Sequence, residues 1–152
     1  MLASGDVAPE FALPDQSGAI VRLSEVLAKG PVVLFFYPAA MSAGCTAEAC
    51  NFRDLAAEFS QAGAQRLGIS VDSVDKQKRF ADQNAFDYPL LSDADLEVAG
   101  AYGVRRRFGP IPVKRATFVI GPDGVIIHTI SSELRMSKHA DEALVVLKNP
   151  GS

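Results

Sequence analysis

The chain passes from a buried strand to the start of a helix within residues 32–50, which read Val32-Val33-Leu34-Phe35-Phe36-Tyr37-Pro38-Ala39-Ala40-Met41-Ser42-Ala43-Gly44-Cys45-Thr46-Ala47-Glu48-Ala49-Cys50. The six apolar residues that open this stretch are typical of a buried strand, and Pro38 then begins a loop of small residues. Helical spacing follows the loop, so we expect Cys45 at or near the first turn of a helix. A strand that leads through a loop into a helix is the building unit of α/β proteins.

The rest of the chain continues this alternation of strands and helices. Short apolar runs rich in β-branched and aromatic residues predict four strands, over Val32–Tyr37, Arg66–Val71, Ala116–Ile120 and Val125–Ile130. Helical periodicity predicts four helices, over Thr46–Ala62, Asp75–Asn84, Ala94–Tyr102 and His139–Leu147. The turn Pro122-Asp123-Gly124 makes the last two strands an antiparallel hairpin. This order predicts an α/β fold with a central mixed sheet flanked by helices.

An extension precedes this core. Pro9–Leu13 and Ala19–Leu23 flank a polar turn and predict an N-terminal β-hairpin, and Ser24–Lys29 predicts one or two helical turns after it. No internal repeat, linker or low-complexity segment interrupts the pattern. A chain of 152 residues can bury a substantial core, so we expect one domain over residues 1–152.

Composition excludes several classes of partner. The formal charge is −3 and the only basic run is Arg105–Arg107, which argues against nucleic acid as the main partner. No segment reaches the length of a membrane span, and no basic leader precedes an apolar stretch, so we expect a cytoplasmic protein without a membrane partner. Two cysteines are too few for a disulfide-stapled secreted framework. In a reducing compartment such a pair points to catalysis, redox sensing or metal binding.

Cys45 is the candidate nucleophile. The positive end of a helix and its unpaired N–H groups stabilise a thiolate relative to a thiol. Cys50 follows five residues later, and on an ideal helix the two Cα atoms would lie roughly 8–9 Å apart. A disulfide requires less than about 7 Å. Any Cys45–Cys50 disulfide would therefore require the first turns of the helix to unwind.

The same segment resembles the peroxiredoxins of the AhpC/TSA family. Their active-site pattern, Pro-x-x-x-Thr/Ser-x-x-Cys, is matched by Pro38, Ser42 and Cys45. The continuation from Gly44 to Asp54 is similar to the bacterioferritin comigratory protein branch, or Q type, in which a second cysteine follows the first by five positions. The strand 115–120 is similar to the family's Arg-x-Thr-Phe segment, and residues 5–15 and 88–93 also fit. The resemblance thus extends over nearly the whole chain.

This resemblance implies a thioredoxin-like fold and a thiol-dependent peroxidase that acts on hydrogen peroxide or alkyl hydroperoxides. Cys45 would attack the peroxide and become a sulfenic acid, and Cys50 would resolve it as an intramolecular disulfide. Arg115 and Ser42 would hold the sulfur and the peroxide, and Pro38 would shield the site from water. Thioredoxin or a glutaredoxin-like protein would restore the thiols. No metal, flavin or haem is implied, and a monomer is expected.

Two departures from the family pattern bear on the substrate. Ser42 stands where threonine is more usual, and it lacks the methyl group that restricts the rotamer. The apolar loop Ala39-Ala40-Met41 replaces polar residues, which favours organic hydroperoxides. Glu48 lies in the first turns of the predicted helix, where a carboxylate suits the helix dipole, and the residue needs no catalytic role.

Three other functions compete with this interpretation. A zinc module would need ligand spacings that Cys45, Cys50, His128 and His139 do not provide. A thiol–disulfide oxidoreductase usually carries Cys-x-x-Cys, whereas four residues separate the cysteines here. A peroxide-sensing redox switch would use the same two cysteines to alter a partner surface, for which the Arg105–Arg107 segment and the loop after it are candidates.

Overall fold

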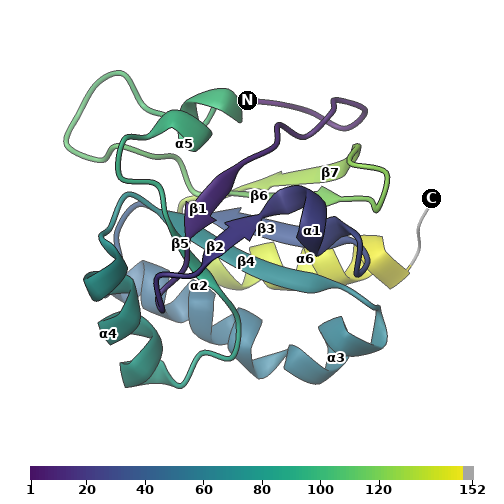
Figure 1. Cartoon of the computed structure of the whole chain (residues 1–152), viewed down its shortest axis with the longest axis horizontal. Coiled ribbons are helices and arrows are strands. Elements are labelled where there is room, and N and C mark those ends of the chain that lie inside the picture. Colours follow the sequence, from purple (N-terminus) through teal and green to yellow (C-terminus); the bar gives the residue numbers. More distant parts are fainter. Residues whose placement is uncertain (149–152) are drawn as a thin grey trace.

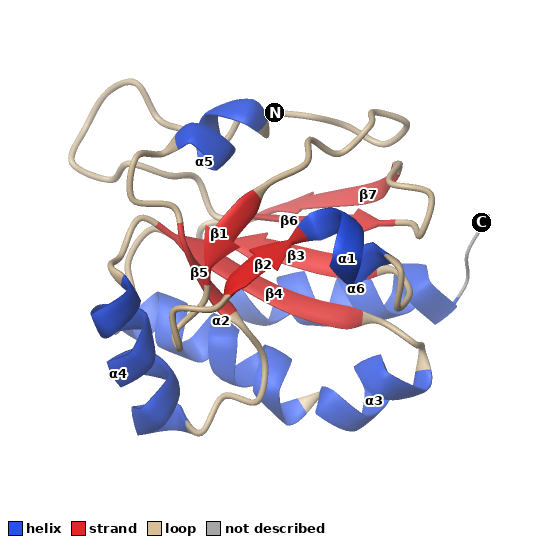
Figure 2. Ribbon diagram, in the orientation of Figure 1, coloured by secondary structure: helices blue, strands red, loops and turns tan. Residues whose placement is uncertain are grey.

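A five-stranded mixed sheet forms the centre of the protein in the computed structural model, which describes residues 1–148 (Figures 1 and 2). The strands are β3 (Val32–Phe36), β4 (Gln65–Ser70), β5 (Leu90–Ser92), β6 (Ala116–Ile120) and β7 (Ile126–Ser131). Their order across the sheet is β5-β4-β3-β6-β7. Strands β3, β4 and β5 run parallel, whereas β6 and β7 are antiparallel to their neighbours, which confirms the predicted mixed sheet and its terminal hairpin.

Helices and the N-terminal segment cover the two faces of this sheet. The helices are α1 (Leu23–Leu27), α2 (Ala43–Asp54), α3 (Ala56–Gln61), α4 (Val74–Asn84), α5 (Glu97–Ala101) and α6 (Met136–Lys148). Residues alternate between faces along a strand, and two hydrophobic clusters follow from that alternation. Val33 and Phe35 belong to the cluster shared with α2, α3, α4 and α6. Leu34 and Phe36 belong to the cluster shared with the N-terminal segment, α1 and α5.

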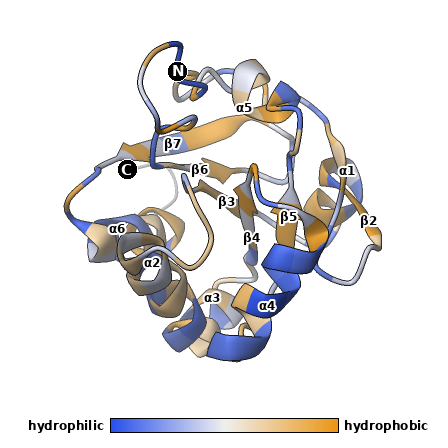
Figure 3. Cartoon of the chain, turned by 90° about the vertical axis from the view of Figure 1, so that its left-hand side faces the viewer, coloured by the Kyte–Doolittle hydropathy of each residue, from blue (hydrophilic) through white to orange (hydrophobic). Residues whose placement is uncertain are grey.

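Hydropathy follows this layered arrangement. The central strands are coloured as hydrophobic, while much of α4 is hydrophilic and lies at the outside (Figure 3). The predicted N-terminal hairpin is confirmed as β1 (Ala12–Pro14) paired antiparallel with β2 (Ile20–Arg22). No helix within residues 1–148 has the length and apolarity that crossing a membrane requires.

The prediction of one continuous helix over Thr46–Ala62 is wrong, because the chain forms α2 and α3 with a break at Leu55. The Phe52 carbonyl would accept from residue 56 in a continuous helix, but it accepts from Arg66 Nη1 at 2.7 Å instead. Phe52 and Phe59 are both buried on the same side of the sheet, so the apolar periodicity continues across the break.

Further differences from the predictions concern α5, α6 and β5. The helix predicted over Ala94–Tyr102 begins only after Leu96, which has a left-handed conformation, and the Asp93 carboxylate accepts from the N–H groups of the first turn. The helix predicted from His139 begins at Met136. Strand β5 is three residues long and was not predicted. The single domain over residues 1–152 stays a prediction, and residues 149–152 lie outside the described part of the chain.

The pairing of β3 with β6 decides where the site is built. Phe36, the last residue of β3, lies opposite Ala116, the first residue of β6. The loop that leaves β3 therefore faces the segment that enters β6. Cys45 follows the first of these segments and Arg115 ends the second, which brings together two residues that are 70 positions apart in the sequence.

Candidate active site

Cys45 lies in the first turn of α2, as predicted, and its side chain is 0% exposed. The backbone N–H of Cys45 donates to Ser42 Oγ at 3.4 Å, so Ser42 is the N-cap of the helix. The Ser42 hydroxyl donates to the Ala39 carbonyl at 2.9 Å. The carbonyl of Ser42 accepts from the Thr46 hydroxyl at 2.8 Å. The hydroxyl of Ser42 therefore shapes the loop and caps the helix, and its proton is directed at Ala39 rather than at the sulfur.

The loop between β3 and α2 is fixed by a residue that the sequence did not single out. Asp72 Oδ2 accepts from the backbone N–H of Ala40 at 2.6 Å and from the Ser70 hydroxyl at 2.7 Å. Asp72 also pairs with Lys76 at 3.0 Å. Met41 adopts a positive φ of 67°, an unusual conformation for a residue with a side chain. The contact from the Ala40 N–H thus ties the loop, with its unusual backbone at Met41, to a buried carboxylate that Ser70 and Lys76 hold in place.

The apolar loop predicted to line the mouth of the site divides into two parts. Ala40 is buried, whereas Pro38, Ala39 and Met41 are partly exposed. The exposed apolar surface of the loop between β3 and α2 therefore comes from Pro38, Ala39 and Met41, of which Met41 packs against the cluster that contains Cys45.

Arg115 contacts the sulfur directly. Its Nη2 donates to Cys45 Sγ at 3.2 Å, and its side chain is buried with 5% of the residue exposed. Its backbone N–H donates to Glu133 Oε1 at 3.1 Å, and that carboxylate also pairs with Arg106 at 2.8 Å. A guanidinium is always charged and offers a rigid fork of donors, so it favours a thiolate at this position. The structure thus brings Arg115 and Cys45 together, as the family resemblance implied.

Glu48 contacts Arg115 in the site, whereas its position in the sequence predicts only a favourable interaction with the helix dipole. Its Oε1 accepts from Arg115 Nη1 at 2.9 Å, and its side chain is 0% exposed. Burial raises the pKa of Glu48 to about 8, and the nearby charge of Arg115 opposes the rise. Burial lowers the pKa of Arg115, but Glu48 and Cys45 outweigh it and raise this pKa above its usual value. Residues 45 and 48 are three apart on one helix, and this spacing places their side chains on the same face of the helix. It is the feature of the sequence that indicates Glu48 as a neighbour of Cys45.

Arg115 reaches the sulfur past a residue that has no side chain. A Cβ on Gly44 would lie 3.3 Å from Arg115 Nη2 and 3.1 Å from Met136 Cε. Both contacts are tighter than ordinary van der Waals packing, so the first turn of α2 approaches Arg115 and α6 closely because residue 44 is glycine.

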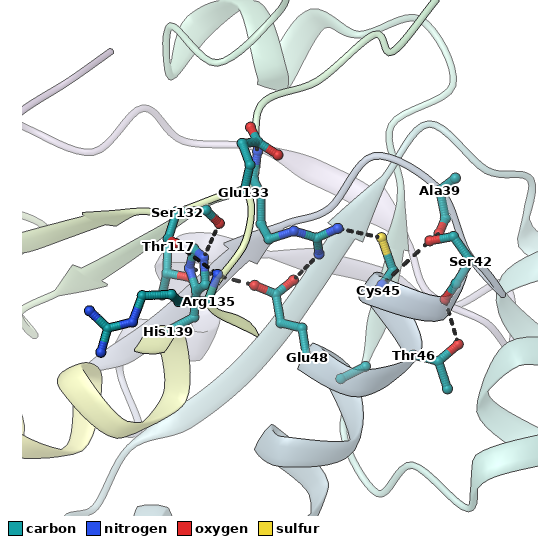
Figure 4. A network of polar contacts seen from close by, with 12 residues as sticks. Ala39, Ser42, Cys45, Thr46, Glu48, Thr117, Ser132, Glu133, Arg135 and His139 are labelled. Carbon is teal, nitrogen blue, oxygen red and sulfur yellow. Dashed lines mark hydrogen bonds and ion pairs between the residues drawn. The ribbon is translucent and has the colours of Figure 1, made fainter. Parts of the chain in front are cut away.

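A buried histidine extends this cluster beyond Glu48. His139 on α6 is 0% exposed, and its Nδ1 lies 2.7 Å from Thr117 Oγ1 and 3.5 Å from Glu48 Oε2. Glu48 lies between Cys45 and His139 in Figure 4. Burial lowers the pKa of His139, which favours the neutral imidazole. From the sequence alone, the only role that His139 suggests is that of a zinc ligand. Within residues 1–148, no three cysteine, histidine or acidic side chains are grouped so that they could hold a metal.

Cys50 lies on the same helix as Cys45 but in a different environment. Its thiol is partly exposed and contacts Asn84 Oδ1 at 3.8 Å. Both cysteines are free thiols within an intact α2, which confirms that the residues between them are helical. The C-terminal half of α2 is tied to its surroundings by the Tyr88 hydroxyl, which donates to the Ala49 carbonyl at 2.7 Å. Arg53 adds a bond from Nη1 to the Asn84 carbonyl at 2.7 Å.

Comparison with known proteins supports the family resemblance. The model of the AhpC/TSA family matches residues 4–129. Peroxiredoxin Bcp of Escherichia coli (strain K12) is 40% identical over 152 residues, covering 97% of this chain and 96% of the relative. The crystal structure of peroxidoxin BcpB from Mycobacterium tuberculosis matches with a TM-score of 0.95 and 54% identity over 100% of both chains. A structure of Xanthomonas campestris peroxiredoxin Q matches with a TM-score of 0.83 and 32% identity, covering 91% of this chain and 89% of that chain.

Proposed function

The chain belongs to the AhpC/TSA family and is a thiol-dependent peroxidase of the bacterioferritin comigratory protein branch, and on this basis we propose that Cys45 is its peroxidatic cysteine and Cys50 its resolving cysteine. The observation that carries the proposal is the contact of 3.2 Å between Arg115 Nη2 and Cys45 Sγ in a buried site. A guanidinium in contact with a sulfur favours the thiolate, which is the form that attacks a peroxide.

In the first step, the Cys45 thiolate attacks one oxygen of the O–O bond. A sulfur–oxygen bond forms, the O–O bond breaks, and the second oxygen leaves as an alcohol or water once it is protonated. The sulfur is oxidised to a sulfenic acid and the peroxide is reduced. Arg115 can stabilise the charge that develops on the leaving oxygen. Ser42 and Asp72 hold the loop around the sulfur, and Pro38, Ala39 and Met41 provide the apolar approach.

In the second step, the Cys50 thiolate attacks the sulfur of the Cys45 sulfenic acid, and hydroxide leaves as water after protonation. Both residues are in α2, so the helix must unwind before their sulfurs can meet. The contacts of Tyr88 and Asn84 with the C-terminal half of α2 oppose this unwinding. The oxidation cycle is therefore coupled to local unfolding of one helix.

The resulting disulfide must be reduced by an external dithiol. We assign this role to thioredoxin or a glutaredoxin-like protein, which exchange thiols with disulfides. The protein is proposed to act as a monomer, because Cys45 and Cys50 of one chain complete the cycle. The apolar approach to Cys45 favours alkyl hydroperoxides, and faster turnover of hydrogen peroxide than of cumene hydroperoxide would contradict this preference.

A peroxidase assay with thioredoxin and its reductase tests the cysteine assignments. Cys45→Ser should abolish turnover, because no thiolate remains to attack the peroxide. Cys50→Ser should consume one peroxide per chain and then stop, because the sulfenic acid has no internal partner. A Cys50→Ser variant with full turnover under thioredoxin would contradict the role of Cys50. Absence of a first oxidation in the wild type would contradict the role of Cys45.

A further inference from the structure

Gln77 of α4 is a polar side chain at the centre of a hydrogen-bond network that the chemistry proposed above does not use. The side chain is 0% exposed, and its amide is engaged at both ends. Nε2 donates to the Leu91 carbonyl and to the Ser70 hydroxyl, each at 2.9 Å, and Oε1 accepts from the Tyr37 hydroxyl at 2.6 Å. A carbonyl can only accept, so the contact with Leu91 fixes which end of the amide is the nitrogen.

The three partners of Gln77 belong to three neighbouring parallel strands. Tyr37 directly follows β3, Ser70 is the last residue of β4, and Leu91 lies within the short strand β5. Tyr37 is also the residue from which the chain leaves the sheet toward Cys45. One buried side chain therefore ties together the edge of the sheet at which the loop of the site begins.

The contact with Ser70 extends to a second point of the same loop. Ser70 Oγ accepts from Gln77 Nε2 and, at 3.2 Å, from the Asp72 N–H, so its one hydrogen is left for Asp72 Oδ2 at 2.7 Å. This carboxylate oxygen also accepts from the Ala40 N–H at 2.6 Å. Lys76, the residue before Gln77 on α4, holds the other oxygen at 3.0 Å. The N-terminal half of α4 thus acts on the loop at its start and again at Ala40.

The loop held at these two points leads to the reactive sulfur. Its backbone at Met41 has a positive φ, and such a conformation persists only where the surrounding contacts determine it. Ser42 is bonded to the Ala39 carbonyl and accepts from the Cys45 N–H, so the loop and the first turn of α2 move together. The distance of 3.2 Å between Arg115 Nη2 and Cys45 Sγ therefore depends on where the loop places this turn.

We propose that Gln77 is a positioning residue for Cys45, because it clamps the loop between β3 and α2 at two points. The inference rests on the proposed function of Cys45. The first clamp is the direct bond to Tyr37, and the second passes through Ser70 to Asp72. Without Gln77, the Ser70 hydroxyl loses the donor that directs its hydrogen at Asp72. The loop then leaves its aligned position more often, and attack on the peroxide slows.

The test measures hydrogen exchange at the Ala40 amide and oxidation of Cys45 by peroxide. Both are followed in the Cys50→Ser chain, in which Cys45 is the only thiol. We expect Gln77→Leu to accelerate exchange at Ala40 about fivefold relative to the amides of the central strands, as loss of one hydrogen bond of ordinary strength would do. Formation of the sulfenic acid should slow by about the same factor. Unchanged exchange at Ala40 would overturn the proposal.

Tyr37→Phe separates a positioning role from a structural one. Gln77→Leu leaves the Tyr37 hydroxyl buried without an acceptor, which lowers the stability of the fold. Adding Tyr37→Phe removes that hydroxyl and should restore part of the thermal stability. The oxidation of Cys45 should nevertheless stay slow relative to Tyr37→Phe alone, because the link to Asp72 is still missing. Recovery of the rate together with the stability would make Gln77 merely structural and overturn the proposal.

Ser70→Ala breaks the same link while it leaves Gln77 in place, and it serves where Gln77→Leu does not fold. It should also accelerate exchange at Ala40, and the opposite result would contradict the second clamp. Tyr102→Phe is the matched control, because it removes a hydroxyl that donates to the Pro9 carbonyl on the opposite face of the sheet. It should change neither measurement.

The two measurements also separate this proposal from the proposed function. Hydrogen exchange uses no peroxide, so it tests the link between Gln77 and the loop even if Cys45 of the unsubstituted chain is not oxidised. Such a failure of oxidation would contradict the role of Cys45 alone. Normal oxidation of Cys45 with unchanged exchange in Gln77→Leu would contradict the role of Gln77 alone.

Discussion

Removal of the Tyr88 hydroxyl should accelerate formation of the Cys45–Cys50 disulfide. The hydroxyl donates to the Ala49 carbonyl at 2.7 Å in the middle of α2, and both groups are buried. A buried hydrogen bond of this kind contributes about 0.5–1.5 kcal/mol net, and it is lost when the helix unwinds. Tyr88→Phe keeps the ring and removes only this bond. The unwound form of α2 should then be about two- to twelvefold more populated, and disulfide formation should be faster by the same factor.

The rate can be measured by adding one equivalent of peroxide to the reduced chain and stopping the reaction with acid at intervals. Alkylation of the remaining thiols and intact-protein mass spectrometry then count sulfenic acid, disulfide and overoxidised species. Tyr102→Phe is the matched control, because the Tyr102 hydroxyl donates to the Pro9 carbonyl at 2.8 Å on the opposite face of the sheet. Equal rates in the two variants would refute the idea that Tyr88 restrains α2. A faster Tyr88→Phe with an unchanged first oxidation step would support it.

Three further outcomes follow from contacts in and around the site. Gly44→Ala should slow sulfenic acid formation at Cys45 about tenfold in the Cys50→Ser chain, because the added Cβ displaces Arg115 Nη2 from the sulfur; an unchanged rate would contradict this. Asp72→Ala should lower the free energy of unfolding in urea by about 1–3 kcal/mol, because the buried Ala40 N–H loses its acceptor; Asp72→Asn keeps an acceptor and should lose less. Burial raises the pKa of Glu48 from 4.5 to about 8 in the folded chain, so between these pH values the folded chain keeps a proton that the unfolded chain loses. The free energy of unfolding of the wild type, measured relative to Glu48→Gln, should therefore fall by up to about 5 kcal/mol as the pH rises from 4.5 to 8. A difference between the two proteins that does not change with pH would contradict the assignment.

The strands that carry the core could be predicted from the sequence because they are buried on both faces. Residues 32–36 and 116–120 are fully buried strands, and their apolar runs are continuous. Strand β5 was missed because three residues are too few to show a pattern. The break between α2 and α3 was missed because Phe52 and Phe59 keep helical spacing across it, while its cause is a contact from Arg66.

The site could be predicted only where its residues share one segment. Cys45 follows from its place after a strand and a loop. Arg115 is brought to the site by the register in which β3 pairs with β6. No local sequence pattern encodes that register, so only the family resemblance indicated Arg115. Glu48 has the spacing of a neighbour on the helix, but its partner lies 67 residues away. His139 comes from another helix, and Asp72 fixes the loop through a backbone N–H, so neither has a signature in the sequence.

Because Phe36 pairs with Ala116, the contact between Cys45 and Arg115 can form only late in the synthesis of the chain. Cys45 emerges from the ribosome long before Arg115, and the two cannot meet until β6 has joined the sheet. Until then, the thiol lacks the guanidinium contact. Under the proposed mechanism, the rate at which Cys45 reacts with peroxide would therefore rise when β6 joins the sheet, and it would report how far folding has proceeded.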